Sequence, residues 1–353
     1  EASTLCKYTE FPVSYFYGLP QINIPLYELT YNDLTVPISI SYHGGGIKAT
    51  ELSGRVGLGW TLNAGGCISR SVCGYPDEVL INVVNDVPPA NPEVLDIRIR
   101  GYHHLTNRDL ELLEFIQNKK YSYEPNFHST DHILNVLHPQ NRFYQEYEGG
   151  YLDATPDRYS FNFLGYSGVF ILTDEHHAVL QTDSPVELVD IRFPSYFSIR
   201  DKKGILYYFE EPEYSYHPYK SGSPGSPPVD TQNDTIKYIS SWHLSKIITP
   251  QNDIIRFTYT ENEKYDIESG VFASRTRADI SVPNYNNFYS SYLNINNIPY
   301  RKISVSPKKL CQIVSGDAVM TFVTDNSVPR EDIPKDHTRL DKLYVQNMQG
   351  EYI

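Results

Sequence analysis

The stretch Leu244-Ser-Lys-Ile-Ile248, followed by Asn252-Asp253 and then Ile254-Ile-Arg-Phe-Thr-Tyr259, decides the fold class. Apolar residues largely alternate with polar ones on both sides of a short turn, which is typical of two antiparallel strands that share one buried face. An Asn-Asp pair suits the tight turn between such strands. The stretch therefore predicts a β-hairpin.

The same pattern recurs on both sides of this hairpin. Each instance has an alternating apolar run, a short turn with Gly or Asx, and a second alternating run. The other instances are residues 159–163 turning at 165–168 into 169–172, residues 197–199 turning at 201–204 into 205–209, residues 310–314 turning at 316–317 into 319–323, and residues 343–345 turning at residue 350. Their irregular spacing predicts an array of hairpins.

The composition of the 353 residues agrees with a β-sheet protein. The chain has 30 Tyr and 15 Phe but only 2 Met, together with 24 Pro and 21 Gly. Aromatic residues suit pleated, half-buried surfaces, and Gly and Pro suit tight turns. We therefore expect an all-β fold, with mainly antiparallel hairpins that form a sheet strip, a sandwich or a shell, and a small helical insertion.

The charge of the chain limits its partners. A formal net charge of −13 disfavours nucleic acid and anionic membranes, because phosphates would be repelled. No run of about 18 apolar residues that could span a membrane is present, and the first residues lack the pattern of a signal peptide. Neutral or cationic partners are expected.

The N-terminal segment, residues 1–78, is expected to begin with a hairpin over residues 20–42 that turns at Asn32-Asp33. Pro25 and Pro37 cannot donate to a ladder, which places them at a sheet edge or a strand start. A glycine-dense stretch with Trp60 follows. We interpret its glycines and Trp60 as a structural turn in which the ring anchors tight backbone reversals; the glycines are Gly57, Gly59, Gly65 and Gly66.

Residues 79–150 break the alternation and are interpreted as a partly helical insertion. Thr106 lies three residues before Asp109, which is the spacing of a capping box, and apolar residues then recur at helical intervals up to Lys119. A second short helix is expected over residues 129–137. The remaining segment, residues 151–353, is expected to be the hairpin array, with a mobile loop over residues 212–234.

Each motif that could bind a metal or act in catalysis can also be explained by an ordinary structural role. The pair His128 and His132 would share a helix face and could bind a metal, but no glutamate follows the first histidine, as zinc proteases require. The pair His103-His104 and the stretch 174–177 are interpreted as surface features. No nucleophile elbow, phosphate loop or dinucleotide fingerprint is present, so we expect neither catalytic residues nor a cofactor or metal.

Four cysteines lack the spacing of a metal site and are too few for a disulfide scaffold; they are Cys6, Cys67, Cys73 and Cys311. On one extended strand, Cys67 and Cys73 would lie roughly 20 Å apart, which is beyond disulfide reach. Three interpretations remain open: buried free thiols, a bridge between these two with a turn between them, and a bridge to a distant partner.

Two motifs carry a resemblance to a known family. The stretch 36–47, Val-Pro-Ile-Ser-Ile-Ser-Tyr-His-Gly-Gly-Gly-Ile, is followed by Val56-Gly-Leu-Gly-Trp-Thr-Leu-Asn-Ala-Gly-Gly-Cys-Ile-Ser-Arg70, and together they resemble the N-terminal region of secreted bacterial RHS/YD-repeat proteins. They are also similar to the opening segment of Tc toxin B components. Further matches to this family lie around Asp157 and around Trp242. True YD repeats have a regular period, whereas the hairpins of this chain are irregularly spaced. The chain therefore resembles the region that precedes the repeats.

The resemblance implies a structural role. In such proteins the repeats build a β-sheet shell, and the variable activity lies in a C-terminal region. We therefore expect a non-catalytic scaffold segment, secreted or at the bacterial cell surface, whose partners are the rest of a longer chain and a C-terminal effector. We also expect the natural protein to continue past Ile353, since the last hairpin is short.

The alternative is a surface protein that binds or degrades glycans, because tyrosines on a sheet can stack on sugars. Tyr214, Tyr216 and Tyr219 would flank the expected loop.

Overall fold

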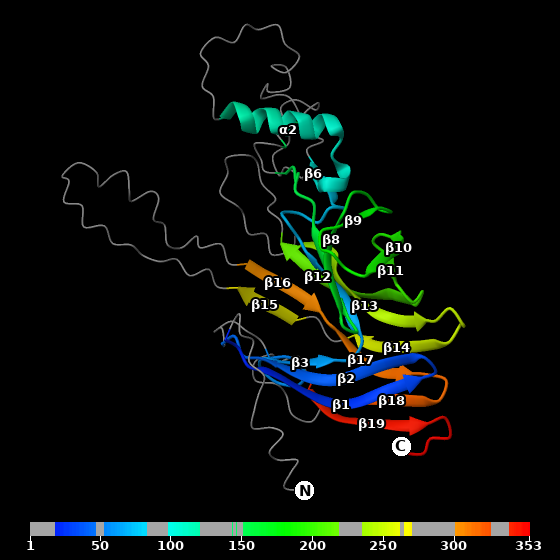
Figure 1. Ribbon diagram of the computed structural model, residues 1–353. Helices are drawn as coiled ribbons and strands as arrows, with labels where there is room; N and C mark the ends of the chain where they lie inside the picture. The colour runs from blue at the N-terminus through cyan, green and yellow to red at the C-terminus, as the bar shows by residue number, and fades with distance from the viewer. Residues whose placement is uncertain are drawn as a thin grey trace, which may run out of the picture.

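A computed structural model describes most of the chain, and its fold is all-β, as the sequence predicts (Figure 1). The described residues are 18–46, 53–82, 98–120, 143, 146, 151–218, 235–261, 265–269, 301–325 and 339–353. Strands of a 14-stranded sheet and a three-stranded sheet account for most of them, and every strand pairing is antiparallel.

A long hairpin forms the trunk of the large sheet. It consists of β12 (Leu206–Pro218) and β13 (Thr235–Ile248), which pair from Leu206 opposite Ile248 to Pro218 opposite Thr235. The expectation of a mobile loop is wrong for residues 212–218, because they continue β12. Tyr214 and Tyr216 alternate there with buried Ser215, so the local pattern is that of a strand. Residues 219–234 lie outside the described part.

Four arms leave the trunk, two along each edge. On the free edge of β12, the first half pairs with β11 (Tyr196–Asp201) and then β10 (Val186–Arg192), and the second half with β16 (Arg301–Ser306) and then β15 (Tyr265–Ser269). On the free edge of β13, the end pairs with β14 (Ile254–Glu261), and the arm continues outward through β17 (Lys308–Val314), β18 (Ala318–Asp325) and β19 (Arg339–Asn347). The middle of β13 pairs with β4 (Gly66–Ser71), and this arm continues outward through β7 (Arg158–Phe163), β8 (Tyr166–Leu172) and β9 (Ala178–Leu180).

The predicted hairpins are confirmed, with one turn misplaced. The first turn is Leu164-Gly165, both with positive φ, and not residues 165–168. Gly168 lies inside β8 opposite Phe161, where a Cβ would come within 2.4 Å of the Phe161 ring. This glycine therefore makes room for a core ring and does not turn the chain.

The small sheet comes from the N-terminal segment. It consists of β1 (Gln21–Tyr31), β2 (Leu34–His43) and β3 (Trp60–Asn63). The predicted turn is confirmed, with Tyr31 opposite Leu34 and Asn32 at a φ of 51°. Pro25 and Pro37 occupy permitted positions, because β1 pairs only with β2 and Pro37 lies before the residues of β2 that pair with β3.

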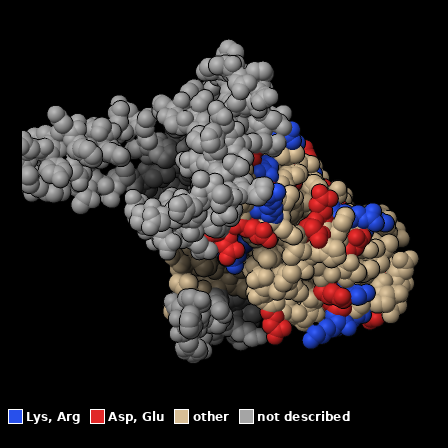
Figure 2. Space-filling view, turned by 90° about the horizontal axis from the view of Figure 1, so that it is seen from above, with Lys and Arg blue, Asp and Glu red and all other residues tan. Residues whose placement is uncertain are grey.

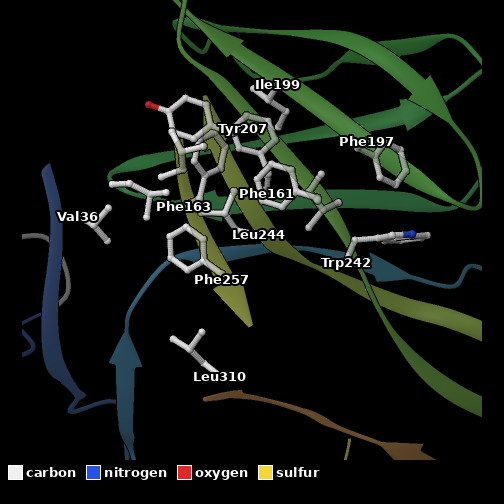
Figure 3. Close-up of a cluster of buried hydrophobic side chains, with 14 of the residues drawn as sticks. Val36, Phe161, Phe163, Phe197, Ile199, Tyr207, Trp242, Leu244, Phe257 and Leu310 are labelled. Carbon is white, nitrogen blue, oxygen red and sulfur yellow. The ribbon is translucent and has the colours of Figure 1, made fainter. Parts of the chain in front are cut away.

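The small sheet packs against the arm that ends in β19, in one continuous core (Figure 1). Leu29, Val36 and Ile38 are buried there. Gly316, in the β17–β18 turn, leaves room for the Tyr31 ring, since a Cβ would lie 2.3 Å from its hydroxyl. Figure 3 shows Val36 on one side of this core and aromatic rings of the large sheet on the other.

The arms that end in β9 and β10 approach each other and nearly close a barrel with the trunk. Phe193 N donates to Glu175 O at 3.2 Å, and His176 Nδ1 lies 3.1 Å from Ile191 O, so the β8–β9 turn touches the end of β10. Rings from both arms meet inside, where the Phe170 and Phe197 centroids are 5.6 Å apart. The core of this region is therefore aromatic and shared by both arms.

The insertion holds the described helices. A two-stranded sheet, β5 (Leu80–Asn82) with β6 (Arg98–Arg100), leads to the 3-10 helix η3 (Tyr102–His104) and to α2 (Asn107–Lys120). The capping box is confirmed: Asp109 N donates to Thr106 Oγ1 at 3.2 Å, and Thr106 N donates to Asp109 Oδ2 at 2.9 Å. The β5–β6 pairing was not predicted. The helix expected over residues 129–137 lies outside the described residues.

Candidate functional site

The glycines before Trp60 form a tight backbone reversal, as the sequence predicts. Gly57 and Gly59 have φ values of 124° and 74°, which side chains rarely adopt. Trp60 N donates to Gly57 O at 3.3 Å, and the Trp60 ring packs 5.2 Å from the Tyr42 ring. Trp60 itself is only partly buried.

Gly65 and Gly66 carry the chain from the small sheet to the large one. Their φ values are 109° and 153°. A Cβ on Gly66 would lie 2.4 Å from the backbone oxygen of Asn162, and one on Gly65 would lie 3.2 Å from the Phe257 ring. The pair therefore permits a close backbone crossing, which agrees with the structural role expected for it.

Arg70 and Asp157, which the sequence analysis singled out separately, meet in a buried ion pair. Arg70 lies on β4, and Asp157 lies immediately before β7, the strand that pairs with β4. Arg70 Nε donates to Asp157 Oδ2 at 2.7 Å, and both side chains are fully buried. The guanidinium also binds Glu78 through two hydrogen bonds, with Nη1 at 3.0 Å from Oε1 and Nη2 at 2.5 Å from Oε2.

Three aromatic rings surround the Arg70 guanidinium. Its Cζ lies 5.3 Å from the Phe193 centroid and 5.7 Å from those of Tyr159 and Tyr238. Burial alone lowers the pKa of Arg70, but the hydrogen bonds with Glu78 and the neighbouring negative charges outweigh burial and raise the pKa. Arg70 therefore stays a cation inside the protein.

Asp157 organises the loop between β4 and β5. Its oxygens accept from Cys73 N at 2.7 Å and from Asp77 N at 3.3 Å. Asp153 supports the same loop, since its Oδ2 accepts from Tyr75 N at 2.7 Å. We call the group of Arg70, Glu78, Asp153 and Asp157 the clasp, because it ties this loop to the strand that follows the insertion.

Asp77 lies beside the clasp and is fully buried. Both of its oxygens lie 3.1 Å from Asp157 N. Burial, and next the charge of Asp157, raise the pKa of Asp77 to about 8, against the lowering effect of Arg70. Asp77 therefore carries a proton at neutral pH.

Trp242, the last residue singled out, is the fully buried indole of the molecule's core. It lies on β13 opposite Ile68 of β4, and its Nε1 donates to Pro194 O at 2.8 Å. Its ring centroid lies 4.9 Å from that of Phe197 in an edge-on contact. Figure 3 shows Trp242 at one end of the core cluster.

Sequence reasoning missed a second polar centre at Asp201, the last residue of β11. Its Oδ2 accepts from the hydroxyls of Tyr166 and Tyr207 at 3.1 Å each. Its Oδ1 accepts from the backbone nitrogens of Lys203 and Ile205. An aspartate two residues before a Lys-Gly turn indicated the backbone contacts, but the tyrosines come from different strands.

The histidine motifs have different outcomes. The stretch 174–177 is an exposed turn, as predicted, with Asp174 Oδ1 accepting from the backbone nitrogens of His176 and His177. The interpretation of His103 as a surface feature is wrong, because its side chain is only 8% exposed and packs edge-on against Phe193. His128 and His132 lie outside the described residues.

Cys67, Cys73 and Cys311 are free thiols, and Cys6 is outside the described residues. Burial, and next the charge of Glu213, raise the pKa of Cys67 to about 11, so this thiol is a weak nucleophile at neutral pH. Within the described ranges, no group of three His, Cys, Asp or Glu side chains is arranged to hold a metal ion. No described helix is long and apolar enough to cross a membrane.

Acidic and basic side chains are interspersed on the described surface in Figure 2. On the trunk, lysines cover tyrosine rings: Lys237 Nζ lies 3.8 Å from the Tyr214 centroid and Lys246 Nζ 4.3 Å from the Tyr208 centroid. The faces of these rings therefore already contact a cation. Tyr219 lies outside the described residues.

No protein-family model and no curated protein matches the chain. Among solved structures, it is similar to a chain in the crystal structure of TcdB2-TccC3-Cdc42, with 12% identity and a TM-score of 0.35, covering 94% of this chain and 13% of that one. It is similar to the N-terminal domain of the effector SpvB from Salmonella typhimurium strain LT2, with 11% identity and a TM-score of 0.29, covering 91% and 78%. A chain of the Photorhabdus luminescens Tc holotoxin pore matches with 12% identity and a TM-score of 0.29, covering 88% and 11%.

The chain thus spans a small part of the Tc toxin chains that it matches. These structures are of the toxin class that the sequence resembles, but the likeness is loose and bears on neither the activity nor the partners of this chain. Membership of the RHS/YD-repeat family stays a prediction.

Proposed function

We propose that this chain is a non-catalytic structural segment of a secreted or cell-surface RHS/YD-repeat-like protein. In this proposal it forms part of a β-sheet shell that carries or presents a C-terminal effector. The observation that carries the proposal is the clasp, in which the charged residues singled out from the sequence are fully buried and bind each other and the backbone. Groups engaged in this way hold the fold together and are closed to a substrate.

The sheet architecture supports a wall-like role. The hairpins merge into one branched sheet in which the β12–β13 trunk supports arms on both edges. The rings of Phe163 in β7 and Phe209 in β12 lie 5.2 Å apart, so this arm is packed against the trunk. A sheet that is curved and braced in this way suits a shell, because each hairpin extends the surface without needing a core of its own.

The alternative, a protein that binds or degrades glycans, needs open aromatic faces or an accessible pair of carboxylates. On the trunk, lysines occupy the faces of Tyr208 and Tyr214. The proposal therefore favours the scaffold, and the alternative becomes an outcome of the test.

The test uses the full-length natural protein and this chain in parallel. Electron cryomicroscopy of the full-length protein should show the described sheet as part of a closed wall around an internal space. A glycan array and a panel of glycoside substrates should show neither affinity nor turnover for this chain. A solid or open particle would overturn the shell, and sugar affinity or turnover that survives purification would favour the alternative.

A matched pair of variants shows whether the wall depends on the clasp. Arg70→Met removes the buried cation, whereas Arg200→Met removes an exposed arginine that pairs with Glu187 at 2.8 Å on the outer face. In the full-length protein, only Arg70→Met should reduce the yield of closed particles. An equal loss with both variants would show that the clasp has no special part in the wall.

A further inference from the structure

The inserted segment, residues 98–120, is held beside the loop between β4 and β5 by the β5–β6 pairing, by the approach of His104 Nε2 to Glu78 O at 2.9 Å, and by two further backbone hydrogen bonds. Gly101 N donates to Val79 O at 2.8 Å, and His103 N donates to Asp77 O at 3.0 Å. The two backbones are in direct contact, because a Cβ on Gly101 would lie 2.2 Å from Pro76 O and 2.5 Å from Asp77 O. The segment therefore covers Asp77, and its departure would expose that side chain.

The charges around Asp77 favour its neutral form. The one cation beside it within the clasp, Arg70, is already bound by the two carboxylates of Asp157 and Glu78. An ionised Asp77 would add another negative charge to this buried group. A carboxyl group that accepts from Asp157 N with one oxygen can carry a proton on the other.

His103 supplies the missing acceptor. Both of its ring nitrogens are buried and have no hydrogen-bond partner among the described residues, which is a costly arrangement. Its Nε2 lies 3.8 Å from Asp77 Oδ2, so a movement of about 1 Å makes a hydrogen bond between them. A proton on Asp77 would satisfy both groups.

We propose that Asp77 and His103 form a one-proton latch, which fastens the inserted segment to the sheet while the pair holds a single proton and loosens when that proton is lost. The latch goes beyond the shell role and does not depend on it. It would let the insertion respond to pH while the sheet stays folded.

The direction of the response follows from proton counting. His103 is faced by five groups: Asp77 and Glu78 on the loop, Arg70 on β4, Glu175 in the β8–β9 turn and His104 on its own helix. Burial lowers the pKa of His103 from its ordinary 6.5, so His103 is neutral in the latched state, whereas the pKa of Asp77 is raised to about 8. The latched state thus holds one proton up to about pH 8.

The released state holds its protons differently. It retains one proton between 3.8 and 6.5, on His103, and none above 6.5. Release should therefore be independent of pH between the lowered pKa of His103 in the latched state and about 6.5. Between 6.5 and about 8 it should increase by up to about fivefold per pH unit.

Hydrogen exchange of this chain, followed by mass spectrometry and corrected for intrinsic rates, tests the latch. Protection of peptides within residues 98–114 should fall about eightfold between pH 6.5 and about 8. Protection of peptides within residues 197–209, in β11 and β12, should not follow it. A flat profile for the inserted segment, or an equal fall in both regions, would overturn the latch.

Two variants separate the roles of the pair. Asp77→Asn keeps an acceptor for Asp157 N and a donor for His103, so its segment should stay protected with no fall above pH 6.5. His103→Gln removes the histidine proton from the released state, so the fall should begin well below 6.5. The latch is refuted if Asp77→Asn keeps the wild-type fall, or if the His103→Gln profile matches the wild type.

Infrared difference spectra of the wild-type chain between about pH 6 and about pH 9 give a test that needs no variant. They should show the carbonyl band of a protonated carboxylic acid disappearing over this interval. If no such band is lost, no carboxyl group titrates there and the latch is refuted even where the variants fail to fold.

Discussion

Removing the Arg70 guanidinium should destabilise the protein by about 3 to 5 kcal/mol, which is the usual cost of leaving a buried charge without its partner. In Arg70→Met the aliphatic stem stays buried, but Asp157, with no exposed side-chain surface, loses its cation. The bonds lost are the one from Nε to Asp157 at 2.7 Å and the two to Glu78. Contacts with three rings at 5.3 to 5.7 Å add to the loss.

Urea unfolding, followed by intrinsic fluorescence and far-ultraviolet circular dichroism, measures this cost. Arg200→Met is the matched control, because Arg200 also pairs with a carboxylate at 2.8 Å but has a side chain that is 45% exposed. The control should cost no more than about 1 kcal/mol. Adding Asp157→Asn to Arg70→Met should restore part of the loss, since it removes the unpaired charge.

A loss of stability in Arg70→Met no larger than that in Arg200→Met would refute this prediction. So would an Asp157→Asn substitution that is equally destabilising with and without Arg70. Either result would mean that the buried pair contributes nothing beyond an exposed one.

Three further predictions concern the core, the pH response and the crossing between sheets. Trp242→Ala should lower stability by about 3 to 5 kcal/mol in urea unfolding, and Trp60→Ala by distinctly less, because only the first ring is fully buried; equal costs would contradict this. The raised pKa of Asp77 means that the folded chain holds a proton that the unfolded chain loses, so the free energy of unfolding should fall by about 2 kcal/mol from pH 6.5 to about 8. Asp77→Asn should flatten this part of the curve of melting temperature against pH. An unchanged slope would refute the assignment of the proton to Asp77. Gly66→Ala should reduce the yield of folded protein sharply, since a Cβ at that φ of 153° would meet the Asn162 and Phe163 backbone; a normal melting curve would show that the crossing can relax.

The hairpins could be predicted from the sequence because their determinants are local. In the hairpin from Leu244 to Tyr259, alternation specifies the buried face and Asn252, at a φ of 70°, specifies the turn. The capping box of Thr106 and Asp109 is equally local, and the helix begins where it indicates. The β5–β6 pair was missed, because strands of three residues are too short to show alternation.

The neighbours of each strand were beyond the reach of the sequence. β4 lies between β13 and β7, and its partner β7 begins 87 residues after the last residue of β4, where Ser71 pairs with Arg158. No local pattern encodes such a pairing, because it depends on which faces and edges remain free once the arms have formed. The sequence therefore indicated many hairpins, but not the trunk that joins them.

The candidate site divides in the same way. The sequence by itself determined the glycines of the turns, since backbone sterics admit few other residues at positive φ, and it marked Arg70, Asp157 and Trp242 as separate features. Only the tertiary structure decided that Trp242 is fully buried while Trp60 is not, and that Arg70 and Asp157 form one buried pair. It also decided that Asp77 and His103 are enclosed together. Burial and charge proximity arise from segments distant in the chain, and these two quantities determine which groups hold a proton.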